Sequence, residues 1–290
     1  MIRPSSPQGN TALQVDAQVV ENVRLARDTY RIRLAAPEIA RKIVPGQFVM
    51  LRLPGRTDPL LARPFALYDT VLDKNDQAIA IDLVYLVIGR VTGLMTELRA
   101  GDSVVLWGPL GNGFTAAGGE RIWMVAGGIG QTPFLALARE GLGLRLYGDP
   151  AREAKSASGV SLVYGVRSAE LLACVDDFTA LGIDVHVITD DGSSGRKGFV
   201  TDLVSARLTE DGKPDRIACC GPEPMMAAVA GLAAEHAIPC ELSLETPMAC
   251  GVGACFSCVA RVRTGQGPED WDYRRVCIEG PVFDASRVIL

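Results

Sequence analysis

The chain has 290 residues, of which 48% are hydrophobic and 22% charged, so it can form two ordinary domains and a small additional segment. Its net charge of -5 and its pI near 5.2, with 29 scattered lysines and arginines, argue against nucleic acid as a partner. Its most apolar stretch, 78–89, contains Asp82 and is too short to cross a bilayer. The polar N-terminus MIRPSSPQGN lacks the apolar core of a secretory signal. We therefore expect a cytoplasmic protein that binds neither membrane nor nucleic acid.

The first hundred residues are expected to form an antiparallel β-barrel or sandwich. Short alternating or β-branched runs recur there, and Pro, Gly and Asp turns separate them. This pattern ends in the turn-prone stretch 115–120, so we place a first domain at residues 13–116. The expected strands are 18–23, 29–34, 47–53, 78–88 and 103–107.

From Glu120 onward, apolar strands alternate with helical stretches. The expected strands are 122–128, 160–166, 183–190 and 216–222, and the expected helices are 132–140, 168–181, 198–208 and 223–237. Such alternation is typical of a parallel sheet with crossover helices, so we expect an α/β domain at residues 119–244. Residues 141–159 are an extra segment, which we treat as a surface insertion.

A glycine cluster at 127–133, GGIGQTP, directly follows an expected strand and opens an expected helix. Its backbone N–H groups and the positive helix end could meet a diphosphate, although a tight turn without a ligand would have the same glycines. The motifs at 164–167 and 220–225 also follow strands, at the edge where open α/β sheets bind ligands. A nicotinamide nucleotide fits that edge, with Gly127, Gly128, Gly130, Thr132, Cys220, Gly221 and Pro222 as the candidate binding residues.

Three acidic residues near these motifs have two interpretations each. Asp190 and Asp191 could bind an adenosine ribose, or they could only begin a turn. The lack of a basic cluster beside them favours NAD over NADP. Glu245 could tune the potential of a nearby cofactor, or it could form a surface ion pair.

The last 41 residues hold four cysteines with the spacing C-x4-C-x2-C-x18-C, which is typical of a plant-type [2Fe-2S] site. Structural zinc sites usually have two close C-x2-C pairs, and a disulfide framework would suit a secreted protein. Gly251 and Gly253 would let the backbone curl around a cluster and direct N–H groups at its sulfurs. We place this segment at 245–290, with Cys250, Cys255, Cys258 and Cys277 as ligands; Cys174, Cys219, Cys220 and Cys240 are expected as buried thiols.

Seven motifs extend over nearly the whole chain: RPFAL, GPLGNGF, GGIGQTPF, YGVR, CGPEPMM, MACGVGACFSC and VCIEGPVF. In this order they resemble the ferredoxin-reductase superfamily and, within it, the iron-sulfur flavoprotein subunit of class 1B dihydroorotate dehydrogenase. The resemblance implies a multidomain β and α/β fold. It consists of an antiparallel FAD-binding β-barrel, a parallel-sheet NAD-binding domain and a small C-terminal [2Fe-2S] segment.

The resemblance also implies where FAD would bind, but the sequence departs from the family pattern at three positions. Ala66 stands where serine or threonine is usual, Leu86 where arginine is common, and Val91 where glycine is expected. Each change removes a donor or a close-approach glycine, at about 1 kcal/mol per lost hydrogen bond, so weaker FAD binding is expected. The FAD contacts that the resemblance implies are Arg63, Pro64, Phe65, Ala66, Val84, Tyr85, Leu86, Val91 and Thr92.

The implied activity is an electron relay. In the family, an FMN-containing catalytic subunit oxidises dihydroorotate, electrons pass singly through the cluster to FAD, and FAD gives a hydride to NAD. The cofactors do this chemistry, so no catalytic acid or base is expected on the chain. The family forms a heterotetramer of two of each subunit, and we expect Phe256, Ser257 and residues 281–283 near its interface.

Three other interpretations stay open. The same architecture could serve another redox complex, such as a sulfide dehydrogenase, a hydrogenase or a bifurcating ferredoxin complex. The changes at Ala66 and Val91 would suit a non-catalytic redox-sensing module. A self-contained oxygenase reductase is a third interpretation, but its fused ferredoxin domain would need more residues than follow Thr246.

Overall fold

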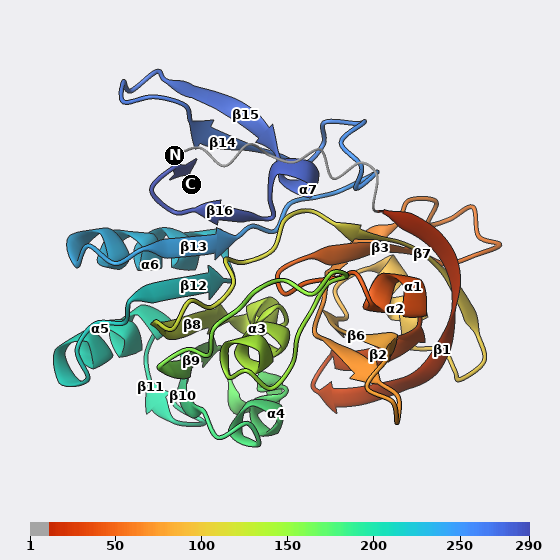
Figure 1. The fold of residues 1–290 in the computed structure, drawn as a ribbon, viewed down its shortest axis with the longest axis horizontal. Helices are drawn as coiled ribbons and strands as arrows, with labels where there is room; N and C mark the ends of the chain where they lie inside the picture. The colour runs from red at the N-terminus through yellow and green to blue at the C-terminus, as the bar shows by residue number, and fades with distance from the viewer. Residues whose placement is uncertain (1–11) are drawn as a thin grey trace.

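The computed structural model describes residues 12–290, which form three β-sheets with helices on the middle one (Figure 1). The N-terminal segment in which we found no secretory signal lies outside this range. Within it, no helix is long and apolar enough to cross a membrane.

The first sheet is antiparallel and curls on itself, because β4 at one end also contacts β6 near the other. Alternate residues of β2 and β6, including Ile32, Leu34, Ile81 and Leu83, fill its core. The predicted antiparallel barrel is confirmed, although β4 and β5 were not predicted as strands. In the order β4-β3-β7-β1-β2-β6-β5, its strands are β1 (Leu13–Ala26), β2 (Thr29–Ala35), β3 (Phe48–Arg52), β4 (Arg63–Ala66), β5 (Asp69–Leu72), β6 (Ala78–Leu86) and β7 (Ser103–Leu110), with helices α1 (Pro37–Ala40) and α2 (Arg90–Met95).

The second sheet has the order β11-β10-β9-β8-β12-β13-β16 and is parallel except for β16, which confirms the predicted α/β domain. The helix predicted at 168–181 is wrong over most of its length, because Cys174 takes a left-handed conformation with φ +65° that interrupts it. The elements are β8 (Arg121–Gly127), η2 (Gly128–Gln131), α3 (Phe134–Gly141), β9 (Gly159–Val166), η3 (Ala169–Leu171), α4 (Val175–Thr179), β10 (Asp184–Thr189), β11 (Arg196–Lys197), α5 (Val200–Glu210), β12 (Arg216–Cys220), α6 (Glu223–Glu235), β13 (Cys240–Ser243) and β16 (Val282–Asp284).

The C-terminal segment forms a third, three-stranded sheet and also joins the second. Strands β15 (Trp271–Arg275), β14 (Val259–Arg263) and β17 (Val288–Ile289) pair in that order, with α7 (Val276–Glu279) after β15. From the same segment, β16 pairs antiparallel with β13. The limits 13–116, 119–244 and 245–290 therefore stay predictions, because the last segment shares a sheet with the one before it.

The stretch 281–283 lies inside the protein. Pro281 and Val282 are buried, and the Asn112 side chain of the barrel end donates to the Val282 carbonyl and accepts its N–H, at 2.7 and 2.9 Å. These two residues fix the C-terminal segment to the barrel. Their burial within this chain does not test whether the stretch lies near a subunit interface, so that expectation stays a prediction.

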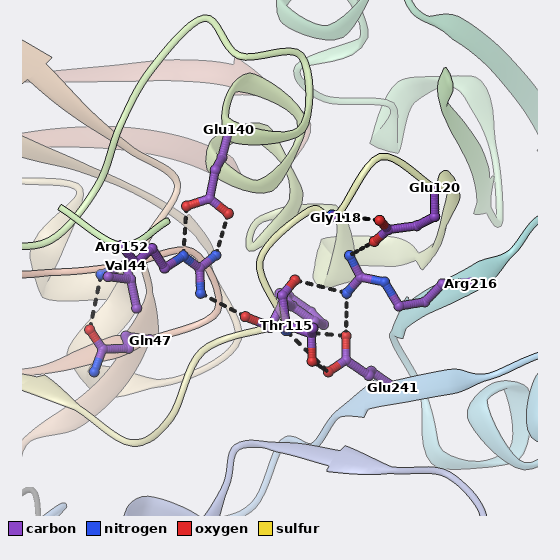
Figure 2. Close-up of polar contacts among 10 residues, drawn as sticks. Val44, Gln47, Thr115, Gly118, Glu120, Glu140, Arg152, Arg216 and Glu241 are labelled. Atoms are coloured by element: carbon purple, nitrogen blue, oxygen red, sulfur yellow. Dashed lines mark hydrogen bonds and ion pairs between the residues drawn. The ribbon is translucent and has the colours of Figure 1, made fainter. Parts of the chain in front are cut away.

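Segment 141–159 is more than a surface insertion, because it ties the α/β domain to the barrel. Tyr147 is 3% exposed and donates to the Asp69 carboxylate of β5 at 2.7 Å. Arg152 binds both carboxylate oxygens of Glu140 and donates to the Phe114 carbonyl at 2.7 Å (Figure 2). The sequence could not reveal these ties, since their partners lie far away in the chain.

A second ionic tie holds the connection between the two larger sheets. Arg216 on β12 lies 2.8 Å from Glu120 and 2.6 Å from Glu241, and it also donates to the Thr115 carbonyl (Figure 2). These residues lie beside the stretch 115–120, in which we placed the first domain boundary. The orientation of the barrel on the α/β domain is thus fixed by charged side chains as well as by packing.

Candidate flavin, nucleotide and cluster sites

A cavity of about 440 Å³ lies between the barrel and the α/β domain. Strand β4, the end of β6 and the start of α2 supply its barrel side, and residues 243–248 supply part of the other. All nine residues implied as FAD contacts line it: Arg63, Pro64, Phe65, Ala66, Val84, Tyr85, Leu86, Val91 and Thr92.

Two polar groups in this cavity are available to a ligand. Arg63 donates only to the Leu61 and Ala62 carbonyls and makes no ion pair within residues 12–290, so its guanidinium can meet a phosphate. The Thr246 hydroxyl is buried without a hydrogen-bond partner there. The Thr92 hydroxyl already accepts hydrogen bonds from the Ile88 and Gly89 N–H groups, because it caps the first turn of α2. The cavity fits a flavin nucleotide, with fewer side-chain donors than the family pattern has.

A second cavity of about 760 Å³ lies at the carboxyl ends of β8, β9, β10 and β12. Gly127, Gly128, Gly221 and Pro222 line it, as the sequence predicts for a nicotinamide nucleotide. Gly128 has φ +57°, and no heavy atom lies within 4 Å of where its Cβ would be, so the loop leaves open space. That space suits the close approach of a diphosphate.

The other three predicted nucleotide residues lie elsewhere. Thr132 and Cys220 line the flavin cavity. Gly130 lines neither cavity, and a Cβ on it would lie 2.3 Å from the Cys220 carbonyl oxygen. Gly130 thus lets the loop pack closely against the end of β12, and its contact with a nucleotide stays a prediction.

The neighbouring acidic residues divide between their two interpretations. Asp190 lines the nucleotide cavity and can meet a ribose. Asp191 accepts from the Ser193 N–H and hydroxyl at 2.9 and 2.6 Å, and these bonds lower the pKa of its carboxyl group. Sequence reasoning missed Ile88 and Phe199, two exposed apolar residues at this cavity. No sequence signal separates them from buried apolar residues.

Glu245 lines both cavities. It makes no ion pair within the described chain, so the interpretation as a surface ion pair is wrong. Its side chain is solvent-accessible because the cleft is open, but protein surrounds it on most sides, and this desolvation raises the pKa of its carboxyl group. Burial and the Glu245 charge also raise the pKa of the neighbouring Cys220 thiol. The carboxyl group is thus placed where the two cavities meet.

The four C-terminal cysteines come together as two pairs. The Cys250 side chain helps to lower the pKa of the Cys255 thiol, and the Cys258 side chain helps to raise that of Cys277, so the two members of each pair lie close enough to interact. No three His, Cys, Asp or Glu side chains of residues 12–290 surround one point as a single metal ion requires. Two pairs suit a [2Fe-2S] cluster, in which each iron takes two thiolates, better than a tetrahedral zinc site.

The loop around these cysteines has the predicted curvature. Gly251 and Gly253 have φ +73° and +78°, and the Val252 N–H donates to the Cys250 sulfur at 3.4 Å. Hydrogen bonds from Ser257 lower the pKa of the exposed Cys255 thiol to about 6. Burial raises the pKa of Cys277 to about 12. The loop therefore presents sulfur atoms and N–H donors of the kind that a cluster needs.

The cluster loop is fastened to the barrel beside the flavin cavity. The Trp107 indole N–H donates to the Cys250 carbonyl at 3.0 Å, and Met50 and Leu110 pack on Gly251. Two residues before Cys250, Met248 lines the flavin cavity. The candidate cluster, flavin and nucleotide sites therefore lie in one continuous series.

Comparison with family models matches three regions of the chain. An oxidoreductase FAD-binding domain matches residues 16–114, and an oxidoreductase NAD-binding domain matches 124–231. The iron-sulfur cluster binding domain of dihydroorotate dehydrogenase B matches 245–289.

Curated relatives decide the family. The dihydroorotate dehydrogenase B (NAD(+)) electron transfer subunit of Caldanaerobacter subterraneus subsp. tengcongensis is 34% identical over 276 residues, covering 95% of this chain and 98% of the relative. The subunit of the same name from Bacillus caldolyticus is 37% identical over 269 residues, covering 92% and 95%. This chain belongs to the dihydroorotate dehydrogenase B electron transfer subunit family. It is thus an oxidoreductase subunit, and the expected FAD, NAD and [2Fe-2S] cofactors are confirmed by its matched domains.

Solved structures agree with this membership. An NADH-dependent reduced ferredoxin-NADP oxidoreductase, described for flavin-based electron bifurcation, superposes with a TM-score of 0.77 at 26% identity, covering 95% of this chain and 90% of that one. The ferredoxin reductase of carbazole 1,9a-dioxygenase gives a TM-score of 0.63 at 20% identity, covering 79% and 67%, and shows the shared fold alone.

For this member of the family, we predict weakened FAD retention. Ala66, Leu86 and Val91 all line the flavin cavity and offer it no side-chain donor. We expect less than one flavin equivalent to remain after extended gel filtration, and Ala66→Ser to raise that fraction by restoring a hydroxyl worth about 1 kcal/mol. Absorbance of the released flavin measures both. Full retention by the unaltered chain would contradict the prediction.

Proposed function

We propose that this chain carries electrons from an FMN-containing dihydroorotate dehydrogenase catalytic subunit, through its [2Fe-2S] cluster and FAD, to NAD+ in pyrimidine biosynthesis. The observation that carries the proposal is the continuous series of sites, in which residues 247–248 line the flavin cavity and Cys250 follows two residues later. The names of the curated relatives support the choice of electron donor.

The chain's own residues would bind and orient the cofactors. Arg63 is placed to meet the FAD phosphates, and the loop at Gly128 leaves room for the NAD diphosphate. Asp190 lies where it can accept a hydrogen bond from a ribose. Bound together, the cofactors would supply the conversion between single electrons and a hydride. Among the described residues, Glu245 is the one acidic residue that lines both cavities.

The partner would dock at the cluster loop, in a heterotetramer of two of each subunit. Cys255 and Phe256 are exposed, whereas Cys258 and Cys277 are buried, so the loop has one side open to a partner. We also expect the complex to work in the cytoplasm, where thiols of this kind stay reduced.

We expect Phe256→Asp to weaken assembly with the catalytic subunit at least tenfold, because Phe256 is 62% exposed on the cluster loop and a carboxylate there would have to be desolvated. Co-purification and a binding titration measure the loss, with iron content as a check on the cluster. Leu144→Asp is the matched control, since Leu144 is exposed on the segment 141–159. Unchanged co-purification would contradict this placement.

The proposal is tested by mixing the purified chain anaerobically with the catalytic subunit of the same organism, dihydroorotate and NAD+, and following the visible spectrum. NADH formation that requires this chain is the expected result. If NADH bleaches the flavin and cluster but never forms from dihydroorotate, the partner is wrong, and another redox complex of the same architecture takes its place. Absence of bleaching by NADH would instead favour a non-catalytic redox-sensing module.

A further inference from the structure

The C-terminal sheet has one face on the protein and one on solvent. On β14, Val262 is 2% exposed, and Ala260 packs against the core of the α/β domain, as does Val288 of β17. Because successive side chains of a strand point to opposite faces, Arg261 and Arg263 point outward, and both are exposed. Their partners across the sheet share this outer face, through the pairs Arg261 with Tyr273 and Ile289, Arg263 with Trp271, and Val259 with Arg275.

This outer face is basic and aromatic. Arg287 adjoins it, because its carbonyl accepts from the Arg263 N–H at 2.7 Å and its guanidinium donates to the Arg263 carbonyl at 3.2 Å. We call the basic face the set Arg261, Arg263, Trp271, Tyr273, Arg275 and Arg287. No Asp or Glu occupies these strand positions or those of Val259 and Ile289.

The charges of the basic face are largely uncompensated. Within residues 12–290, no carboxylate forms an ion pair with Arg261, Arg263 or Arg287, and the Arg275 guanidinium lies 3.7 Å from Glu279. The whole chain has a net charge of -5, so the rest of its surface is acidic on balance. The four arginines thus form a positive region on an otherwise acidic protein, which is the pattern of a surface that attracts an acidic partner.

The basic face is continuous with the cluster loop. Arg275 places its guanidinium 5.0 Å from the centre of the Phe256 ring and donates to the Gly253 carbonyl at 3.2 Å. Phe256 takes φ +57°, which is rare for an aromatic residue, and its side chain is exposed. The basic face therefore lies directly beside the exposed side of the cluster loop.

We propose that the basic face is a docking surface for a carboxylate-rich patch on the catalytic subunit, and that it sets the orientation in which the cluster meets the partner's redox centre. This inference rests on the proposed function and extends it from the cluster loop to the neighbouring sheet. Arg, Trp and Tyr are the residues enriched at the energetic centres of protein interfaces. Complementary charges around the cluster loop would speed the association of the two subunits and favour one orientation of the complex. A relay of single electrons requires such a fixed orientation.

Nucleic acid is a poorer occupant for this face. Base stacking needs an open aromatic surface, but Tyr273 lies edge-on to the Trp271 ring with centroids 5.3 Å apart, and Arg261 lies 5.9 Å from the centre of the same ring. An anionic membrane would attract the arginines, yet the face has no inserting apolar helix. A protein with an acidic patch fits the charges of this face better.

The test uses the holoprotein with FAD and cluster bound and the purified catalytic subunit. The double variant R261E/R263E is titrated against that subunit at several NaCl concentrations. We expect at least tenfold weaker binding than the unaltered chain, and a smaller dependence of affinity on salt. The control R41E/K74E changes the net charge by the same amount on exposed barrel residues and should bind as the unaltered chain does. Iron content, FAD content and the rate of flavin bleaching by NADH should be unaltered in both variants.

The outcomes separate this inference from the proposed function. If the unaltered chain binds the subunit and forms NADH, but R261E/R263E binds equally well, the inference fails alone. If the unaltered chain does not bind the subunit, the proposed function fails and the inference fails with it. Loss of binding to single-stranded RNA or to anionic vesicles, with assembly unchanged, would overturn the inference in favour of that ligand. Should R261E/R263E lose iron, the milder R261Q/R263Q is compared in its place under the same criterion.

Discussion

Gly251→Ala is expected to prevent assembly of the [2Fe-2S] cluster while leaving the flavin and nucleotide sites working. Gly251 has φ +73°, and a Cβ there would lie 2.5 Å from Cγ of Met50, which is fully buried. A left-handed non-glycine residue costs about 1–2 kcal/mol, and overpacking a core typically costs about 1–3 kcal/mol more. This destabilisation arises only when the cluster loop packs on the barrel. The substitution therefore disfavours the loop conformation that positions Cys250 and Cys255.

Iron and sulfide analysis, together with the visible spectrum after reconstitution, measures this effect. We expect little of the unaltered cluster content, normal bleaching of FAD by NADH, and correspondingly little NADH from dihydroorotate. Gly231→Ala on α6 is the matched control, because nothing lies within 4 Å of its Cβ position and alanine favours a helix. A full cluster in Gly251→Ala would show that the loop can close without its left-handed glycine.

Sequence patterns predicted most of the fold because the relevant signals are local. Alternation along β2 and β6 and the strand–helix alternation after Glu120 follow from which residues must face a core, and both were confirmed. The two glycines between the expected ligands likewise predicted a curled loop, and both take left-handed conformations in the structure. The assignment of the four cysteines as ligands stays a prediction. These features depend on neighbours within a few residues, which the sequence displays directly.

The features that escaped prediction depend on residues far apart in the chain. Cys174 stops a helix that its flanking residues favour, and β16 leaves the cluster segment to pair with β13. From the sequence, Glu245 is expected to be a carboxylate at the end of a strand. Its position at both cavities follows only from how the barrel packs on the α/β domain. Gly130 looks like a ligand-binding glycine but packs on the Cys220 carbonyl. Composition and spacing hold no information about which distant atoms fill the space around a residue.

Segment 141–159 was the least predictable part of the chain, and it contributes to a buried ionic centre. The Asp69 carboxylate on β5 lies 2.9 Å from Arg139 of α3 and 3.1 Å from Arg145, and it accepts from Tyr147. Burial raises the pKa of Asp69 above its ordinary value, although Arg145, Tyr147 and Arg139 each act to lower it. The surrounding donors thus compensate only in part for desolvation of the carboxylate.

Arg145→Met is therefore expected to destabilise the protein by about 3–5 kcal/mol at pH 8, because it leaves the buried Asp69 charge with one cation fewer. Arg145 also donates to the Thr70 carbonyl, which would lose that bond. Since the pKa of Asp69 is raised on folding, the folded state holds the proton more tightly than the unfolded state. The penalty is thus full above the folded pKa and shrinks as pH falls toward the ordinary aspartate value of about 3.9.

Urea unfolding of the unaltered chain and of Arg145→Met, compared between pH 8 and pH 5, measures this loss. The control is Arg27→Met, since Arg27 pairs with Glu170 on the surface, with both side chains about half exposed. Exposed pairs contribute about 0–1 kcal/mol, so the control should unfold nearly as the unaltered chain does at both pH values. A loss at Arg145 no larger than at Arg27, or one that grows as pH falls, would mean that the Asp69 charge is not what the segment 141–159 compensates. A larger loss at Arg145 that shrinks as pH falls would instead show that ionic contacts of this segment hold the barrel, and with it the flavin cavity, against the nucleotide-binding sheet.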